Sequence, residues 1–169
     1  MKAITGSNIY GPIATIILTA ALAIPAAAQK QVPIKGTIQG QDTDKGFTSP
    51  GLFLVESNGT GNAILLGRFT FKLESTINVA EFIGTGLAHF EAANGDTIDA
   101  TYATTRPSQV QPTPDGFVFS IQEIYTITGG TGRFEGAKGS FVMDRVADPQ
   151  KFITFGSFSG SITPPGAAH

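Results

Sequence analysis

Apolar and polar side chains alternate with a period of two along most of the chain beyond residue 30. The pattern is clearest in residues 63–74, where Phe69, Phe71 and Leu73 are separated by polar residues. Because successive side chains of a β-strand point to opposite faces, this alternation predicts strands with one buried face. Turn-forming residues recur about every ten residues, with no helical periodicity between them. The pattern therefore predicts an all-β fold, either a sandwich or a barrel.

The alternating segments number about eight. Between them, residues 41–50 are polar and are expected to form a loop, and Asn58-Gly59 and Asn94-Gly95 have the composition of tight turns. Residues 106–116 contain three prolines and form the longest irregular stretch, either a functional cover or a mobile surface loop. The predicted strands are residues 32–38, 52–56, 63–74, 81–92, 96–104, 117–128, 134–146 and 152–163.

A glycine-rich stretch, residues 126–141, lies between two of these strands and has the sequence TITGGTGRFEGAKGSF. Glycine accepts the positive φ angles of tight turns, so Gly129, Gly130 and Gly132 predict a hairpin corner. Gly136 and Gly139 are expected within the returning strand, where glycine marks a bend or a close approach of backbone. Repeated bends of this kind curl a sheet on itself. The stretch therefore favours a barrel over a sandwich.

Three segments carry a family resemblance: residues 61–70 (GNAILLGRFT), residues 90–102 (FEAANGDTIDATY) and the glycine-rich hairpin. In this order they resemble bacterial secreted members of the superfamily that includes plant allene oxide cyclases and dirigent proteins. The resemblance implies a single eight-stranded antiparallel β-barrel with a central cavity, and its plant members are trimeric. The first predicted strand lacks the acidic residue of the plant cyclases, and the chain has no cysteine. No catalytic residue is therefore carried over from the family.

The first 28 residues have the features of a cleaved signal peptide. Lys2 precedes an apolar run, residues 12–24, and small residues follow at Ala26 and Ala28. The run is shorter than the roughly 20 residues that span a bilayer, although an uncleaved N-terminal anchor is the alternative. We therefore expect residues 1–28 to be removed and the protein to be secreted or periplasmic. Residues 29–163 then form one barrel domain, and residues 164–169 form a flexible tail.

Composition narrows the function classes. The chain carries a formal net charge of −2, which argues against binding to nucleic acid or to an anionic membrane surface. It has thirteen phenylalanines but no tryptophan or cysteine, so stability must come from apolar burial rather than from disulfides. The two histidines are far apart in sequence, and the Asp42–Gly46 segment has only the opening of a calcium loop. We expect no metal site and no cofactor.

Four residues are candidates for lining a barrel cavity. Glu123 and Tyr125 share the face of their strand with Phe117 and Phe119, so they point inward if the phenylalanines do. An inward carboxylate is either paired with a cation or shifted toward its neutral form, and Arg68 is a candidate partner if its face of residues 63–74 is the inner one. The alternative is that Glu123 lies at the barrel mouth in water. Tyr102 is the fourth candidate.

These features leave three functions open. The first is non-catalytic binding of a small apolar ligand or a partner. The second, which the resemblance to allene oxide cyclases implies, is an isomerase or cyclase acting on an apolar substrate in the cavity. The third is a structural subunit of an extracellular or envelope assembly. Residues 152–163 carry apolar side chains on both faces, which would require cover by a neighbouring copy. We therefore expect a homo-oligomer, a trimer or a dimer.

Overall fold

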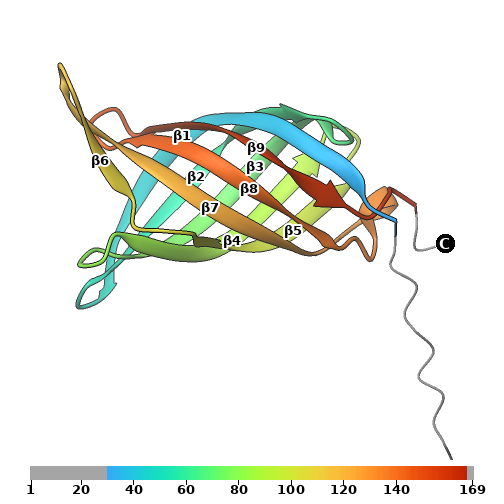
Figure 1. Cartoon of the computed structure of the whole chain (residues 1–169), viewed down its shortest axis with the longest axis horizontal. Helices are drawn as coiled ribbons and strands as arrows, with labels where there is room; N and C mark the ends of the chain where they lie inside the picture. Colours follow the sequence, from blue (N-terminus) through green and yellow to red (C-terminus); the bar gives the residue numbers. More distant parts are fainter. Residues whose placement is uncertain (1–29, 167–169) are drawn as a thin grey trace, which may run out of the picture.

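A computed structural model of the chain describes residues 30–166, and this part is built from β-strands and one short 3-10 helix. Figure 1 shows the strands wrapped around a common axis. The predicted signal peptide lies outside the described residues, as do the last three residues of the predicted tail. The elements are β1 (Val32–Ser49), β2 (Leu52–Ala63), β3 (Gly67–Asn78), β4 (Ile83–Ala92), β5 (Thr97–Thr104), β6 (Gln109–Thr113), β7 (Gly116–Gly130), η1 (Gly132–Phe134), β8 (Gly139–Asp148) and β9 (Ile153–Ile162).

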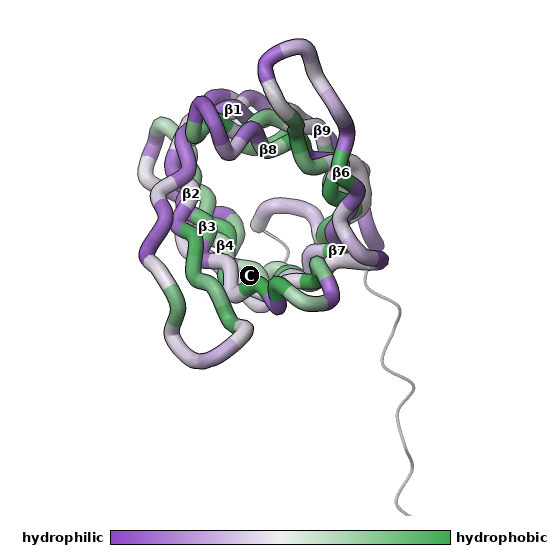
Figure 2. Tube along the Cα trace, turned by 90° about the vertical axis from the view of Figure 1, so that its left-hand side faces the viewer, coloured by the Kyte–Doolittle hydropathy of each residue, from purple (hydrophilic) through white to green (hydrophobic). Residues whose placement is uncertain are grey.

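The sheet closes on itself. Each strand pairs antiparallel with the next along the order β5-β4-β3-β2-β1-β9-β8-β7, and β5 also pairs with β7, which joins the two ends. The result is the predicted eight-stranded antiparallel barrel, seen along its axis in Figure 2. The ninth strand, β6, pairs only with the first part of β7 and lies outside the ring. The prediction of an all-β barrel is confirmed.

The first two strands are much longer than the sequence pattern predicts. β1 runs through the segment predicted to be a polar loop, and β2 runs through Asn58-Gly59, so both predictions are wrong. Gly40 and Gly59 face each other in the middle of this pair. A Cβ on either glycine would lie 2.8 Å from the ring of Phe71, so glycine here makes room for an aromatic ring rather than a turn.

Two other segments also differ from their predictions. Residues 106–116 contain β6, whose five residues are all exposed, so the predicted loop is a short outer hairpin with β7. The predicted strand 134–146 begins only at Gly139, because Phe134 belongs to η1. The glycine-rich stretch does join β7 and β8 in the predicted hairpin, but their connection is a compact loop containing η1 rather than a tight turn.

That loop closes one end of the barrel. Phe134 and Ala137 are buried, and Arg133 forms an ion pair with Asp96 at 2.8 Å. Gly132 has a φ of +58°, and a Cβ there would clash with the Asp96 side chain, so this position requires glycine. The described ends of the chain pack beside the loop, with Gly166 donating a backbone hydrogen bond to Arg133. We call this the closed end.

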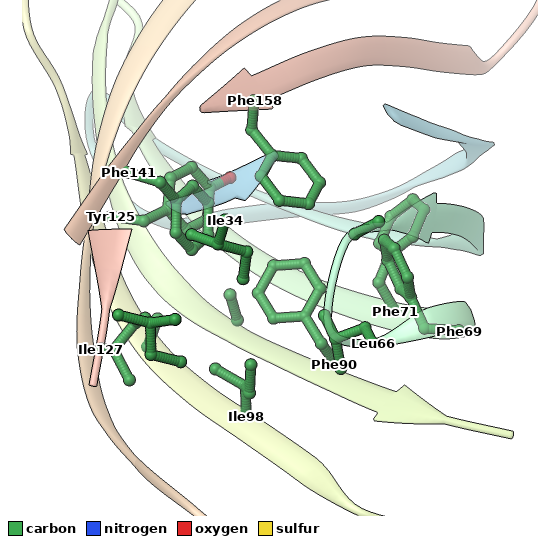
Figure 3. Packing of buried hydrophobic residues seen from close by; sticks show 14 of the residues in the cluster. Ile34, Leu66, Phe69, Phe71, Phe90, Ile98, Tyr125, Ile127, Phe141 and Phe158 are labelled. Carbon is green, nitrogen blue, oxygen red and sulfur yellow. The ribbon is translucent and has the colours of Figure 1, made fainter. Parts of the chain in front are cut away.

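Aromatic side chains fill the half of the barrel next to the closed end. Phe90, which is 1% exposed, lies in the middle of this core (Figure 3). Its ring contacts Phe69, Phe141 and Phe158 at centroid separations of 5.7, 6.0 and 6.5 Å. Aromatic pairs at these separations stabilise a core beyond the area that they bury. The phenylalanines thus fill the interior of this half of the barrel.

Candidate functional site

A pocket of about 250 Å³ opens at the other end of the barrel, which we call the mouth. β7 connects the two ends of the barrel: its first half lines the pocket, whereas η1 at the closed end comes shortly after its last residue. Ten of the pocket's thirteen lining residues are apolar, and the polar ones are Asp42, Asp44 and Ser108. The apolar lining residues are Phe53, Val55, Ile77, Val79, Phe82, Phe119, Ile121, Ala147, Pro149 and Phe152.

A layer of polar side chains separates this pocket from the aromatic core. Inward positions of a strand are two residues apart. On four strands, the inward position that follows an apolar wall residue toward the core is polar. Asp42 of β1 belongs to the same layer, since it pairs with Ser57 across the sheet. The four pairs of wall residue and layer residue are Val55 with Ser57, Ile77 with Ser75, Ile121 with Glu123, and Ala147 with Arg145.

A buried ion pair lies at the centre of the polar layer. Glu123 is 1% exposed and Arg145 is 6% exposed. The Arg145 Nη2 donates to Glu123 Oε1 at 2.7 Å, and its Nε donates to Oε2 at 3.2 Å. Arg145 stands diagonally across from Glu123, because β7 pairs Ile121 with Arg145 and Glu123 with Met143. This two-bond geometry satisfies charges that burial would otherwise make very costly.

Further hydrogen bonds fix the pair. Tyr125 donates its hydroxyl to Glu123 Oε2 at 3.1 Å, and Arg145 Nη1 donates to Thr154 Oγ1 at 3.3 Å. Burial alone would lower the pKa of Arg145, but the adjacent Glu123 carboxylate outweighs burial and raises that pKa. Arg145 therefore stays charged at all relevant pH values. Both oxygens of Glu123 are occupied by donors from Arg145 and Tyr125.

Tyr102 and Tyr125 stack on each other beneath the pocket. Their ring centroids are 4.6 Å apart with an interplanar angle of 19°, and Tyr125 in turn stacks on Phe141 at 4.7 Å (Figure 3). Tyr102 hydrogen-bonds Ser75. Burial raises the pKa of Tyr102 to about 12, with Arg145 opposing the shift and Glu123 adding to it. Burial, helped by Glu123, also raises the pKa of Tyr125. Both hydroxyls therefore keep their protons at neutral pH, and that of Tyr125 donates to Glu123.

The structure brings three of the four predicted lining residues together. Glu123, Tyr125 and Tyr102 are all buried inside the barrel, so Glu123 does not lie in water at the mouth. Arg68 is exposed on the outer face, and the ion pair predicted between it and Glu123 is not formed. The physical reason is alternation: Phe69 and Phe71 point inward, which places Arg68 outward.

Sequence reasoning missed the actual partner, Arg145. It alternates with Phe141 and Met143, the same signal that placed Glu123 inward on its own strand. The sequence pattern presents Asp42 only as part of an incomplete calcium loop. Its inward orientation depends on β1 continuing beyond residue 40, which the local sequence does not indicate.

Other polar groups within residues 30–166 form no comparable site. His89 bonds Asp99 at 2.7 Å between Nδ1 and Oδ1, but both side chains are about half exposed on the outer face of the sheet. In this part of the chain, no three histidine, aspartate or glutamate side chains gather closely enough to hold a metal ion. Residues 30–166 also contain no helix of the length and apolar character needed to cross a membrane.

Comparison with known proteins adds no relative. No protein-family model matches the chain, and neither a curated protein nor a solved structure is significantly similar to it. Function must therefore be inferred from the barrel, the mouth pocket and the polar layer.

Proposed function

We propose that this protein binds a small, mainly apolar molecule in the mouth pocket without converting it. The observation that carries the proposal is the pocket itself, with its apolar wall above a polar layer. Small-molecule sites typically combine an apolar lining with a few well-placed polar groups. The apolar side chains around the open pocket expose apolar surface to water, and a ligand that covers this surface is bound favourably.

The size of the pocket sets the size of the ligand. A dry cavity of about 150 Å³ accepts benzene, and sites for drug-sized molecules begin near about 300 Å³. At about 250 Å³, this pocket suits one aromatic ring with a short side chain, or an aliphatic chain of similar bulk. A long acyl chain would not fit, because the phenylalanine-filled half of the barrel prevents it from going deeper.

The polar layer supports binding rather than turnover. A cyclase or isomerase that moves protons needs a general base within reach of its substrate. Glu123 is engaged by Arg145 and Tyr125, and the raised pKa values of both tyrosines keep them protonated. Glu123, Arg145 and the two tyrosines therefore favour a role in fixing the pocket, and within the layer only Asp42 presents a carboxylate oxygen to a bound molecule. The isomerase or cyclase alternative implied by the resemblance to allene oxide cyclases remains an untested prediction.

Oligomerisation and export also remain predictions. Leu87, Ile124 and Phe155 are exposed apolar residues on three different strands, and they offer surface to a second copy. Analytical ultracentrifugation of the protein would show whether it forms the expected trimer or dimer. Export depends on residues 1–28, and N-terminal sequencing of the secreted protein would locate the cleavage site.

A pair of tryptophan variants tests the binding proposal. Ile121 lies on the pocket wall, whereas Ile124, on the same strand, is 44% exposed on the outer face. Isothermal titration calorimetry with 2-phenylethanol and n-butylbenzene should detect binding to the wild type and to Ile124→Trp. Ile121→Trp should abolish binding, because the indole fills the pocket. Equal binding to both variants, or no binding to the wild type, would overturn the proposal.

A further inference from the structure

The polar end of the ligand can be inferred from the charges around the mouth pocket. We propose that the ligand is a small amphiphile with a protonated amine, which pairs with Asp42 while its apolar part contacts the pocket wall. This inference rests on the proposed binding function and adds the chemical class of the ligand.

Asp42 is the only residue of the polar layer that also lines the pocket. Its Oδ1 accepts a hydrogen bond from Ser57 at 2.6 Å, and its backbone N–H donates to the Phe152 carbonyl at 2.9 Å. The side chain and backbone are therefore held in place. Its Oδ2 accepts no hydrogen bond from any of residues 30–166, and it is left available to a molecule in the pocket.

The charges around the pocket do not cancel. Arg145 is neutralised by Glu123, so Asp42 leaves the polar layer with one net negative charge. Asp44 adds a second carboxylate nearer to the mouth. No lysine or arginine lines the pocket, and within residues 30–166 neither Asp42 nor Asp44 forms an ion pair.

This imbalance selects for a cation. A carboxylate entering the pocket would be desolvated beside like charges, which is unfavourable in a partly apolar site. An ammonium group gains an opposite charge there, and its three N–H groups donate to carboxylate oxygens. The phenylalanine rings of the wall also attract a cation through their faces. A neutral alcohol can use only the hydrogen bond and not the charge.

A matched series of ligands tests this inference at neutral pH. The probes 2-phenylethylamine, 2-phenylethanol and phenylacetate share a ring and differ in the end group. Calorimetry should show the amine binding about tenfold more tightly than the alcohol, with phenylacetate weakest. The advantage of the amine should shrink when salt rises from about 50 mM to about 500 mM, because salt screens the charge pair.

Variants connect this preference to one carboxylate. Asp42→Asn keeps an oxygen for Ser57 but removes the charge, so it should lower amine affinity about tenfold and leave alcohol affinity unchanged. Asp144→Asn makes the same change on an exposed aspartate of β8 that does not line this pocket, and it should have no effect. If Asp42→Asn does not fold, the preference and salt dependence of the wild type still decide the question.

The outcomes separate the two proposals. Equal affinity for amine, alcohol and carboxylate would overturn the amine assignment and leave the binding function intact. An amine preference that survives Asp42→Asn would also overturn the role of Asp42. If none of the three probes binds, the binding function itself fails and the amine assignment fails with it.

Discussion

The two ends of the barrel use the same residue type for different purposes. At the closed end, Phe69, Phe90 and Phe158 are each less than 5% exposed and pack against one another. At the mouth, Phe82 is 42% exposed and Phe152 is 48% exposed, and both line the pocket. The difference arises because the glycine-rich loop closes one end, while nothing within residues 30–166 covers the other. Phenylalanine therefore forms a core where it is enclosed and part of the wall of the mouth pocket where it is not.

The boundary between the two regions is the Glu123–Arg145 pair. Buried ion pairs seldom add stability compared with apolar residues of the same size, but removing one partner of such a pair is strongly destabilising. Here the pair stands one inward position below the pocket wall on both β7 and β8. It lies between the apolar pocket wall and the aromatic core on these two strands.

The largest expected effect compares one phenylalanine from each region. Phe90→Ala should lower the free energy of unfolding by about 3–5 kcal/mol, because it leaves a cavity among four other rings. Phe119→Ala should cost less than about 1.5 kcal/mol, because its side chain is only partly buried and its loss merely widens the pocket. Urea denaturation measures both, and equal losses would contradict the distinction between core and wall.

The next largest effect is expected from removing one partner of the Glu123–Arg145 pair. Arg145→Met should destabilise the protein by about 3 kcal/mol, because Glu123 would then be buried without its cation. The double variant Glu123→Leu with Arg145→Met should recover most of that loss, since no charge remains buried. Urea denaturation of the single and double variants gives both values. A double variant that is as unstable as Arg145→Met alone would show that the layer acts through something other than charge pairing.

A smaller effect should appear at alkaline pH. The pKa of Tyr102 is about 12 in the folded protein, above the unfolded value near 10. Its contribution to stability is therefore complete below pH 10 and is lost as pH rises toward 12, by up to about 3 kcal/mol. Unfolding free energies measured across this range should fall less steeply for Tyr102→Phe than for the wild type. Parallel curves would mean that Tyr102 is not buried as described.

Local alternation was enough to predict an all-β fold and the inward face of several strands, and the glycine bends with the family resemblance favoured the barrel. Alternation placed Phe69 with Phe71 and Glu123 with Tyr125, because these residues lie in uninterrupted strands with one buried face. It failed at Gly40 and Gly59, where glycine is required by the approach of the Phe71 ring from a neighbouring strand. Contacts of that kind depend on tertiary packing and have no signature in the local sequence.

The candidate site was predictable only in part for the same reason. Choosing Arg145 over Arg68 requires knowing that β8, and not β3, is the neighbour of β7. It also requires the register that places Arg145 opposite Ile121. Neither the neighbour nor the register can be read from one strand at a time. The pocket was likewise invisible, since it depends on which end of the barrel the glycine-rich loop covers.

Methyl NMR of the isoleucines during titration with 2-phenylethylamine tests the central claim most directly. Ile77 and Ile121 line the mouth pocket, whereas Ile34, Ile98 and Ile127 are buried toward the closed end. The account predicts that the δ1 methyl signals of Ile77 and Ile121 shift with ligand concentration while those of the other three stay in place. Shifts confined to the closed-end or outward-facing isoleucines would contradict a ligand site at the mouth.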